Sequence, residues 1–164
     1  MSQAARRRFV SRNGNPFRSF PDLASLLSLE VNADDAVLDG EIVKLDENGR
    51  PQFYDLMRRH GPFAFVAFDV LVLNGKDVRK LALADRKRLL RAIVPRRSSS
   101  VLYAQHIVGH GRELFAEVCA HDLEGIVAKH SESTYGADEP RQWIKVKNAA
   151  HSQAVDRHEL FERS

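Results

Sequence analysis

The chain has 164 residues, of which 43% are hydrophobic, and this suffices for one globular domain with a packed core. Its 25 Lys and Arg residues against 22 Asp and Glu residues give a net charge of +3, which permits a polyanionic partner without requiring one. No apolar stretch approaches the roughly 20 residues needed to cross a bilayer, and no secretory signal is evident. A single cysteine excludes an intramolecular disulfide, so we expect a cytoplasmic protein without a membrane partner.

The first half of the chain alternates short strand patterns with helix patterns. Asn13-Gly14 is a hairpin-type turn signal, and Pro21 is typical of the first turn of a helix. The predicted elements are an arginine-rich strand at 6–12, a helix at 20–29, a strand at 36–45 and a short helix at 52–60.

The second half opens with the longest apolar run, which its aromatic and β-branched residues identify as a buried strand. The predicted elements are strands at 63–73 and 100–108, helices at 83–94 and 113–123, and two final strands, "GIVAKH" and "WIKVKN". In the helix at 83–94 we expect Leu89, Leu90, Ile93 and Val94 to pack, and Arg86, Lys87, Arg88 and Arg91 to face outward. The pattern predicts one α+β domain of mainly antiparallel sheets with three or four helices.

The strand "WIKVK" carries the first chemical signal. A period of two places Trp143, Lys145 and Lys147 on one face, with successive same-face residues roughly 6–7 Å apart. Two ammonium groups at that spacing repel unless an anion with two or more charges lies between them. A polyphosphate or phosphodiester meets that need, and a solvated strand face is the alternative interpretation.

Carboxylates within apolar strands provide the second signal. Asp39 and Glu41 share one face of "AVLDGEIVKL", where a cation, a metal or a hydroxyl-bearing ligand must compensate them, unless Asp39 only shapes a turn. Asp69 interrupts the longest apolar run, and the neighbouring Phe68 points to the other face, where its ring stacks on a base or fills the core. In "EGIVAK", Glu124 converges with Lys129 only if the glycine between them bends the chain.

Together and in order, these segments resemble the nucleotidyltransferase (adenylation) domain of ATP-dependent DNA ligases, in particular the small bacterial ligase-like type. The resemblance runs through "SRNG" (11–14), "LDGEIV" (38–43), "FVAFDVLVLNGKDVRKLAL" (65–83), "EGIVAK" (124–129) and "WIKVK" (143–147). It implies an ATP-grasp-like core of antiparallel sheets with flanking helices, in which residues 1–148 form a partial adenylation domain and 149–164 a C-terminal tail. Each motif is short, but five in the same order are specific.

The resemblance also implies roles for individual residues. Lys145 and Lys147 are expected to bind the α-phosphate of ATP and later of AMP, and Lys129 assists at the same site. Glu124 resembles the residue that binds Mg²⁺ or Mn²⁺, Glu41 the carboxylate that contacts the ribose or the metal, and Phe68 the ring that stacks on adenine. Arg12 resembles the arginine that contacts the 5′-phosphate of nicked double-stranded DNA. Nucleotidyl transfer depends on such positioning and charge neutralisation.

The sequence departs from the family pattern at one point. Family members attack ATP through the lysine of a K-x-D-G motif upstream of "SRNG", and no K-x-D-G occurs here. The similar string "KLDENG" (44–49) follows "LDGEIV", so we expect Lys44 to flank a turn. The prediction is therefore a DNA ligase of this family, acting in DNA repair and recombination, with an N-terminally incomplete core that is not expected to ligate DNA without the missing lysine. Three alternatives remain: a non-catalytic module that binds nucleotide or DNA, a split ligase whose other polypeptide supplies the lysine, or an unstable remnant.

Overall fold

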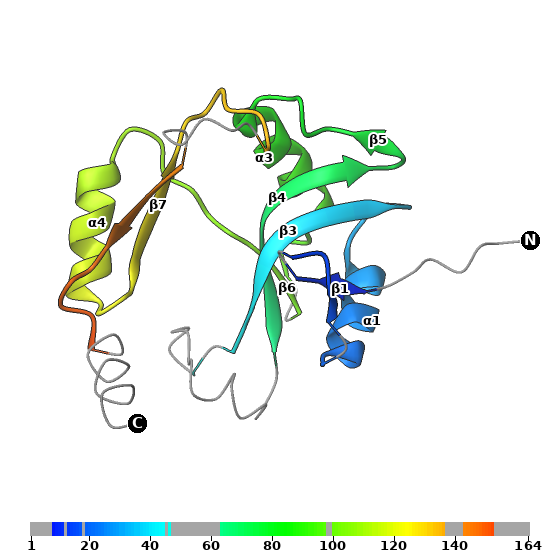
Figure 1. Cartoon of the computed structure of the whole chain (residues 1–164), viewed down its shortest axis with the longest axis horizontal. Helices are drawn as coiled ribbons and strands as arrows, with labels where there is room; N and C mark the ends of the chain where they lie inside the picture. Colours follow the sequence, from blue (N-terminus) through cyan, green and yellow to red (C-terminus); the bar gives the residue numbers. More distant parts are fainter. Residues whose placement is uncertain are drawn as a thin grey trace, which may run out of the picture.

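The computed structural model describes residues 8–11, 13–17, 19–44, 46, 63–97, 100–136 and 143–152. The predicted helix at 52–60 lies outside these residues. In chain order the elements are β1 (Phe9–Val10), β2 (Pro16–Phe17), α1 (Pro21–Glu30), β3 (Ala36–Val43), β4 (Ala64–Leu73), β5 (Lys76–Asp77), α3 (Leu83–Ile93), β6 (Val101–Tyr103), α4 (Gly111–Ala120), β7 (Gly125–Lys129) and β8 (Trp143–Lys147) (Figure 1).

The larger sheet is built on the long apolar strand β4. β3 and β5 pair with β4 antiparallel, whereas β6 pairs with it in parallel, so the sheet is mixed rather than wholly antiparallel. Asn74 and Gly75 turn β4 into β5 with φ of 47° and 76°, the two positive values that a tight type I′ hairpin requires. The predicted strand at 100–108 is correct only for its first residues, because β6 ends at Tyr103.

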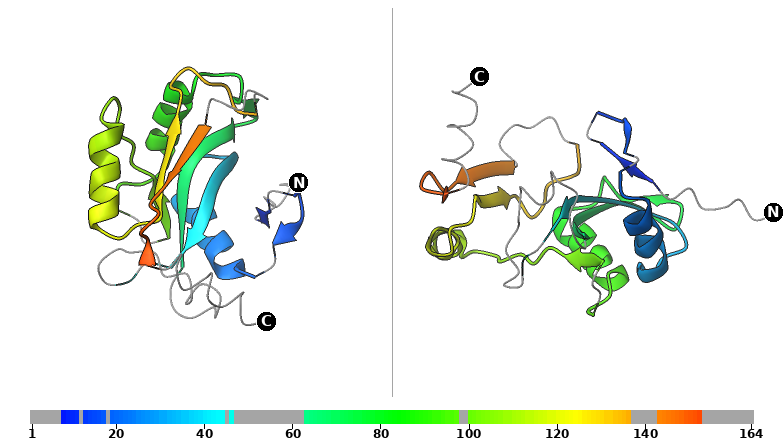
Figure 2. Two further views of the ribbon diagram at one scale, coloured as in Figure 1. Left: turned by 60° about the vertical axis from the view of Figure 1, so that its left-hand side comes forward. Right: turned by 90° about the horizontal axis from the view of Figure 1, so that it is seen from below.

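The hydrophobic core lies between this sheet and the helices α1 and α3. Ala67, Val70, Leu90 and Val101 are completely buried at its centre, and α1 contributes Leu23. Figure 2 shows α1, α3 and α4 on one side of the sheets when the molecule is seen from below. The opposite side of the sheets is therefore the one that the described helices leave uncovered.

Two side chains of α3 contradict the sequence prediction. Arg86 is completely buried and Lys87 nearly so, although the helical pattern placed both on the outer face. The prediction failed because it weighed only the helix's own apolar stripe, whereas partners on β4 and in the segment after β7 surround these two cations. Arg88, by contrast, is exposed as expected.

A second, two-stranded antiparallel sheet is formed by β7 and β8, with α4 beside β7 (Figure 1). Gly125 begins β7 with φ of 151°, and a Cβ at this position would lie 2.2 Å from the carbonyl oxygen of Val146. Only glycine permits this close approach of the two strands. The glycine of "EGIVAK" therefore allows β7 and β8 to approach closely where β7 begins.

The segment from Ser131 to Gly136 connects the smaller sheet to the larger one. The amide of Ala84 donates to the carbonyl oxygen of Ser131 at 3.0 Å, and the amide of Tyr135 donates to that of Arg79 at 2.8 Å. We call residues 131–136 the strap. Its backbone bonds fasten the end of β7 to the start of α3 and the loop before it.

Candidate functional site

The register of the smaller sheet gathers the lysines. Lys129 lies opposite Trp143, and Val127 lies opposite Lys145. Residues directly opposite one another in an antiparallel pair project to the same face. Lys129, Lys145 and Lys147 therefore share one face of β7–β8, and Trp143 lies on the same face at the start of β8. We call this set of three the lysine face.

Lys129 lies between two aromatic rings that come from different sheets. Its ammonium nitrogen is 3.7 Å from the centre of the Trp143 ring and 4.8 Å from the centre of the Phe68 ring. Burial lowers the pKa of Lys129, and the negative charges of Asp69 and Asp39 partly oppose that shift. The contact with Phe68 brings the lysine face of β7–β8 next to β4.

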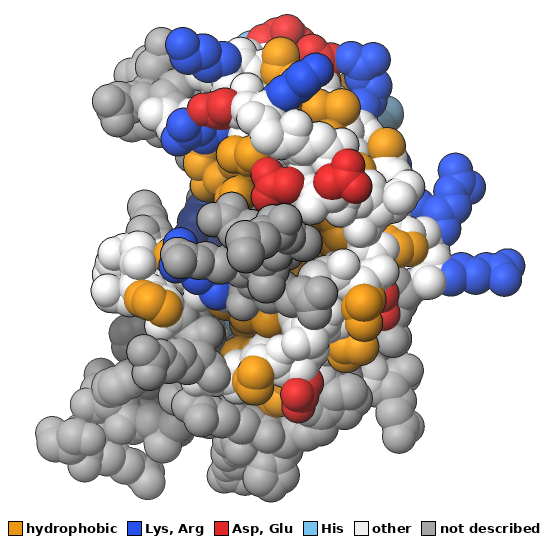
Figure 3. All heavy atoms as spheres, turned by 90° about the vertical axis from the view of Figure 1, so that its right-hand side faces the viewer, with side chains coloured by type: hydrophobic (Ala, Val, Ile, Leu, Met, Phe, Trp, Pro, Cys, Tyr) orange, Lys and Arg blue, Asp and Glu red, His pale blue; other side chains and the backbone are white. Residues whose placement is uncertain are grey.

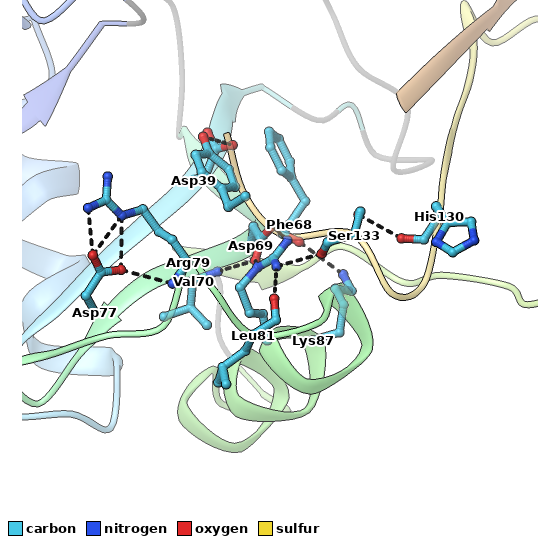
Figure 4. A network of polar contacts seen from close by, with 12 residues as sticks. Asp39, Phe68, Asp69, Val70, Asp77, Arg79, Leu81, Lys87, His130 and Ser133 are labelled. Carbon is cyan, nitrogen blue, oxygen red and sulfur yellow. Dashed lines mark hydrogen bonds and ion pairs between the residues drawn. The ribbon is translucent and has the colours of Figure 1, made fainter. Parts of the chain in front are cut away.

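Phe68 reaches this position because β4 has a bulge there. Asp39 pairs with Asp69 and Gly40 pairs with Ala67, so Phe68 has no partner on β3. A bulge redirects the side chain of its extra residue. In Figure 4 the ring of Phe68 and the carboxylate of Asp39 project away from α3, whereas the carboxylate of Asp69 turns to Arg86 of that helix.

A tyrosine hydroxyl of the chain itself compensates Asp39, in place of the cation, metal or hydroxyl-bearing ligand that the sequence predicted. The hydroxyl of Tyr135, in the strap, donates to Oδ2 of Asp39 at 2.9 Å. Burial and this hydrogen bond raise the pKa of Tyr135 to about 12. The Tyr135 ring also lies edge-on to Trp143, with the ring centres 5.8 Å apart. Tyr135 therefore links Asp39 of the larger sheet to Trp143, one of the two rings beside Lys129.

The buried ion pair of Asp69 and Arg86 lies behind the site. Nε and Nη2 of Arg86 donate to the two carboxylate oxygens of Asp69, each at 2.9 Å, and both side chains are completely buried. Nη1 of Arg86 donates to the carbonyl oxygens of Leu81 and Ser133 (Figure 4). One guanidinium therefore holds β4, the loop before α3 and the strap together.

Lys87 is a second buried cation that the sequence analysis did not single out. Its ammonium donates to the carbonyl oxygen of Ala104 at 2.8 Å and lies 4.2 Å from the centre of the Tyr103 ring. Burial, with the nearby positive charge of Lys129, lowers the pKa of Lys87 to about 8. These contacts join α3 to the end of β6.

The segments that form this geometry also match a known protein family. Residues 2–147 match the family model described as the ATP dependent DNA ligase domain. The chain belongs to the ATP-dependent DNA ligase family. This confirms the family and the α+β nucleotidyltransferase fold that the motif order predicted.

Individual relatives agree with this assignment. The multifunctional non-homologous end joining protein LigD of Pseudomonas aeruginosa is 33% identical over an alignment of 147 positions, which covers 85% of this chain and 17% of that protein. DNA ligase 2 of Methanosarcina acetivorans is 29% identical, and the match covers 85% of this chain and 28% of that protein. This ligase-family chain therefore spans less than a third of the curated relatives that it matches.

Two solved structures have the same fold. The ligase domain of LigD from M. tuberculosis is 34% identical with a TM-score of 0.70, and the match covers 85% of this chain and 46% of that one. A mycobacterial DNA ligase D complexed with ATP and MES is 32% identical with a TM-score of 0.73. That match covers 86% of this ligase-family chain and 47% of the solved one.

The other candidate residues of the ligase motifs are exposed or lie outside the described residues. Glu41 is exposed on β3, and Glu124 is exposed directly before β7, where its carbonyl oxygen accepts from the amide of Asn148 at 2.8 Å. Lys145 and Lys147 are exposed, and no carboxylate forms an ion pair with them within the described ranges. Arg12 lies outside the described residues.

Among the described residues, no preformed metal cage is present. Across the part of the chain that the structure describes, no three His, Cys, Asp or Glu side chains gather as metal ligands. Mg²⁺ is commonly bound by one or two carboxylates together with substrate phosphate oxygens and water. The exposed carboxylates of Glu41 and Glu124 fit that kind of site but not an all-protein one.

The remaining surface of the ligase-family chain is mixed. On the side that carries β5 and α1, acidic and apolar side chains are scattered, and Lys and Arg side chains stand mainly toward the edges of the view (Figure 3). Among the described helices, none is long and apolar enough to span a membrane.

Proposed function

We propose that this chain is the nucleotide-binding part of an ATP-dependent DNA ligase, and that Lys129, Lys145 and Lys147 bind the phosphates of ATP and AMP. The arrangement of the lysine face supports this most strongly. Three ammonium groups share one face, and none of them is neutralised by a carboxylate within the described residues. A polyphosphate supplies the missing negative charge.

The same proposal gives Phe68 the role of stacking on adenine. Its ring comes from a bulge, is partly accessible and projects toward the lysine face, as a ring that fills the core would not. Residues 1–148 then form the adenylation part, and 149–164 the tail. The solved mycobacterial relative with ATP has the same fold over 86% of this chain, which supports ATP as the nucleotide.

The metal and the DNA complete the proposed site. Glu124 and Glu41 would hold Mg²⁺ or Mn²⁺ jointly with nucleotide phosphates, and the metal would neutralise charge as AMP is transferred. Arg12 would contact the 5′-phosphate of the nick. Arginine suits such backbone contacts because neutralising a phosphate releases counterions from DNA.

Family chemistry proceeds in three steps, and the last one separates the hypotheses. First, a lysine takes AMP from ATP and releases pyrophosphate; second, AMP passes to the 5′-phosphate of the nick. Third, the 3′-hydroxyl attacks that phosphate, the anhydride bond to AMP breaks, and AMP leaves with the electron pair. The third step needs no lysine nucleophile. A chain without K-x-D-G can therefore be tested on DNA that is already adenylylated.

The experiment compares binding and sealing in the same preparations. We expect the chain to bind labelled ATP in equilibrium dialysis and to join an adenylylated nick in the presence of Mg²⁺. A charged hydrogen bond contributes roughly 1.5–3 kcal/mol, so the double variant Lys145→Met/Lys147→Met should weaken ATP binding about 100-fold or more. The matched control Lys76→Met/Lys80→Met removes two exposed lysines near β5 and should bind ATP normally.

The alternatives predict different results. A chain that binds ATP but never joins an adenylylated nick is a binding module. Joining of an ordinary nick only after a K-x-D-G polypeptide is added identifies a split ligase. Failure of the wild-type chain to bind ATP, with the fold intact, would refute the proposed role of the lysine face.

A further inference from the structure

The Lys129 ammonium covers a ring that the proposed nucleotide needs. Its nitrogen lies 4.8 Å from the centre of Phe68 and 3.7 Å from the centre of Trp143. A cation within about 6 Å of a ring centre is attracted by the negative face of the ring, and most strongly by tryptophan. Lys129 therefore occupies the approach to Phe68.

The contact is built into the fold. Lys129 and Trp143 are directly opposite in the β7–β8 register, so their side chains are neighbours on one face. Tyr135 packs edge-on against Trp143 and is itself fixed by its hydrogen bond to Asp39. Both the cation and its tryptophan partner are thus held by strand pairing and by the strap.

Ion pairing does not explain the position of Lys129. The two carboxylates whose charge acts on it, Asp69 and Asp39, are already bound by Arg86 and Tyr135. Within the described residues, Lys129 forms no ion pair. Its ammonium is half-buried and held by aromatic faces, a weaker attachment than a direct bond to phosphate.

We propose that Trp143 is a positioning residue that holds Lys129 over Phe68, so that a base gains access to Phe68 only when a phosphate draws the ammonium away. This inference rests on the proposed function of the lysine face. A nucleotide carries both groups, so its phosphates move Lys129 and its base takes the vacated ring. A nucleoside has no phosphate and must displace the cation without compensation. Lys129 and Trp143 therefore select nucleotides over nucleosides.

The test uses ligands that separate base from phosphate. Labelled ATP and labelled adenosine are titrated by equilibrium dialysis against the wild-type chain and the variant Lys129→Ala. We expect the variant to bind ATP about 10-fold more weakly, because a phosphate ligand is lost. We expect it to bind adenosine about 3- to 10-fold more tightly, because Phe68 is uncovered. A residue that only binds phosphate, or only stabilises the fold, does not produce these opposite changes.

Three further variants sharpen the comparison. Lys145→Ala removes a lysine that does not contact Phe68, so ATP binding should weaken while adenosine binding stays unchanged. Lys129→Arg keeps a cation over the rings and should leave adenosine binding weak. Trp143→Leu loosens the hold on Lys129 and should strengthen adenosine binding in the same direction as Lys129→Ala.

The single tryptophan provides a second readout. Tripolyphosphate, which has no base, should change the Trp143 fluorescence of the wild-type chain and not that of Lys129→Ala. Circular dichroism melting first establishes that each variant is folded. Unchanged, weaker or undetectable adenosine binding by folded Lys129→Ala overturns the inference, even if ATP binds the wild-type chain. Absence of ATP binding to the wild-type chain instead refutes the proposed function, and this inference with it.

Discussion

Replacing Arg86 by methionine should destabilise the protein strongly. The substitution keeps much of the side-chain volume but leaves the completely buried carboxylate of Asp69 without its counter-charge. The carbonyl oxygens of Leu81 and Ser133 also lose their donor. Removing one partner of a buried pair costs about 3–5 kcal/mol, which for a domain of this size lowers Tm by roughly 6–20 °C.

Urea unfolding at pH 7, followed by circular dichroism and by the fluorescence of Trp143, measures this loss. Arg79→Met is the matched control, because Arg79 forms the same bidentate contact with Asp77 on the exposed surface. The control should leave the midpoint almost unchanged, since water screens an exposed pair. The double variant Asp69→Leu/Arg86→Met removes both charges and should be more stable than Arg86→Met alone. A loss below about 1 kcal/mol for Arg86→Met, or no recovery in the double variant, would refute this reasoning.

Three other predictions concern Gly40, Asp77 and Lys87. Gly40→Ala should destabilise the protein by about 1–3 kcal/mol in urea unfolding, because the added Cβ would lie 2.4 Å from a backbone oxygen of β4. Gly111→Ala is the control: its Cβ would meet nothing within 4 Å, so the free energy of unfolding should be unchanged or slightly higher. The hydrogen bonds from Arg79 lower the pKa of Asp77 to about 2, so in Arg79→Met an NMR titration should find that pKa near 3.9. Burial lowers the pKa of Lys87 to about 8 in the folded protein, against about 10.4 in the unfolded chain. Between these two pH values the unfolded chain binds more protons than the folded protein, so the free energy of unfolding should rise with pH. Lys87→Met should show a smaller rise between pH 7.5 and 10, and an unchanged rise would contradict the assignment.

The local features of the fold were predictable from the sequence. Periodicity located α1, β3, β4, α3 and the two final strands. The shared face of Trp143, Lys145 and Lys147 also followed from the period of two. These features depend on neighbouring residues, so a single sequence contains the information for them.

The features that depend on distant partners were not predictable. The helical pattern alone indicated that Arg86 and Lys87 face solvent, and it carries no signal for a carboxylate 17 residues away on β4. The bulge at Phe68 and the parallel pairing of β6 likewise depend on strand register. Tyr135 gave no sequence signal, because its partner Asp39 lies 96 residues earlier in the chain. The available signal was a carboxylate within an apolar strand, with no oppositely charged residue near it in the sequence.

The hydrogen bond between Tyr135 and Asp39 also bears on how the protein is made. It joins residues 96 positions apart, and a ribosome adds roughly 5–20 residues per second. Asp39 therefore leaves the ribosome roughly 5 to 20 seconds before Tyr135 follows. The pair of Asp69 and Arg86, only 17 positions apart, can close much earlier. A larger sheet that formed before the strap and β7 were synthesised would lack the contact between Lys129 and Phe68.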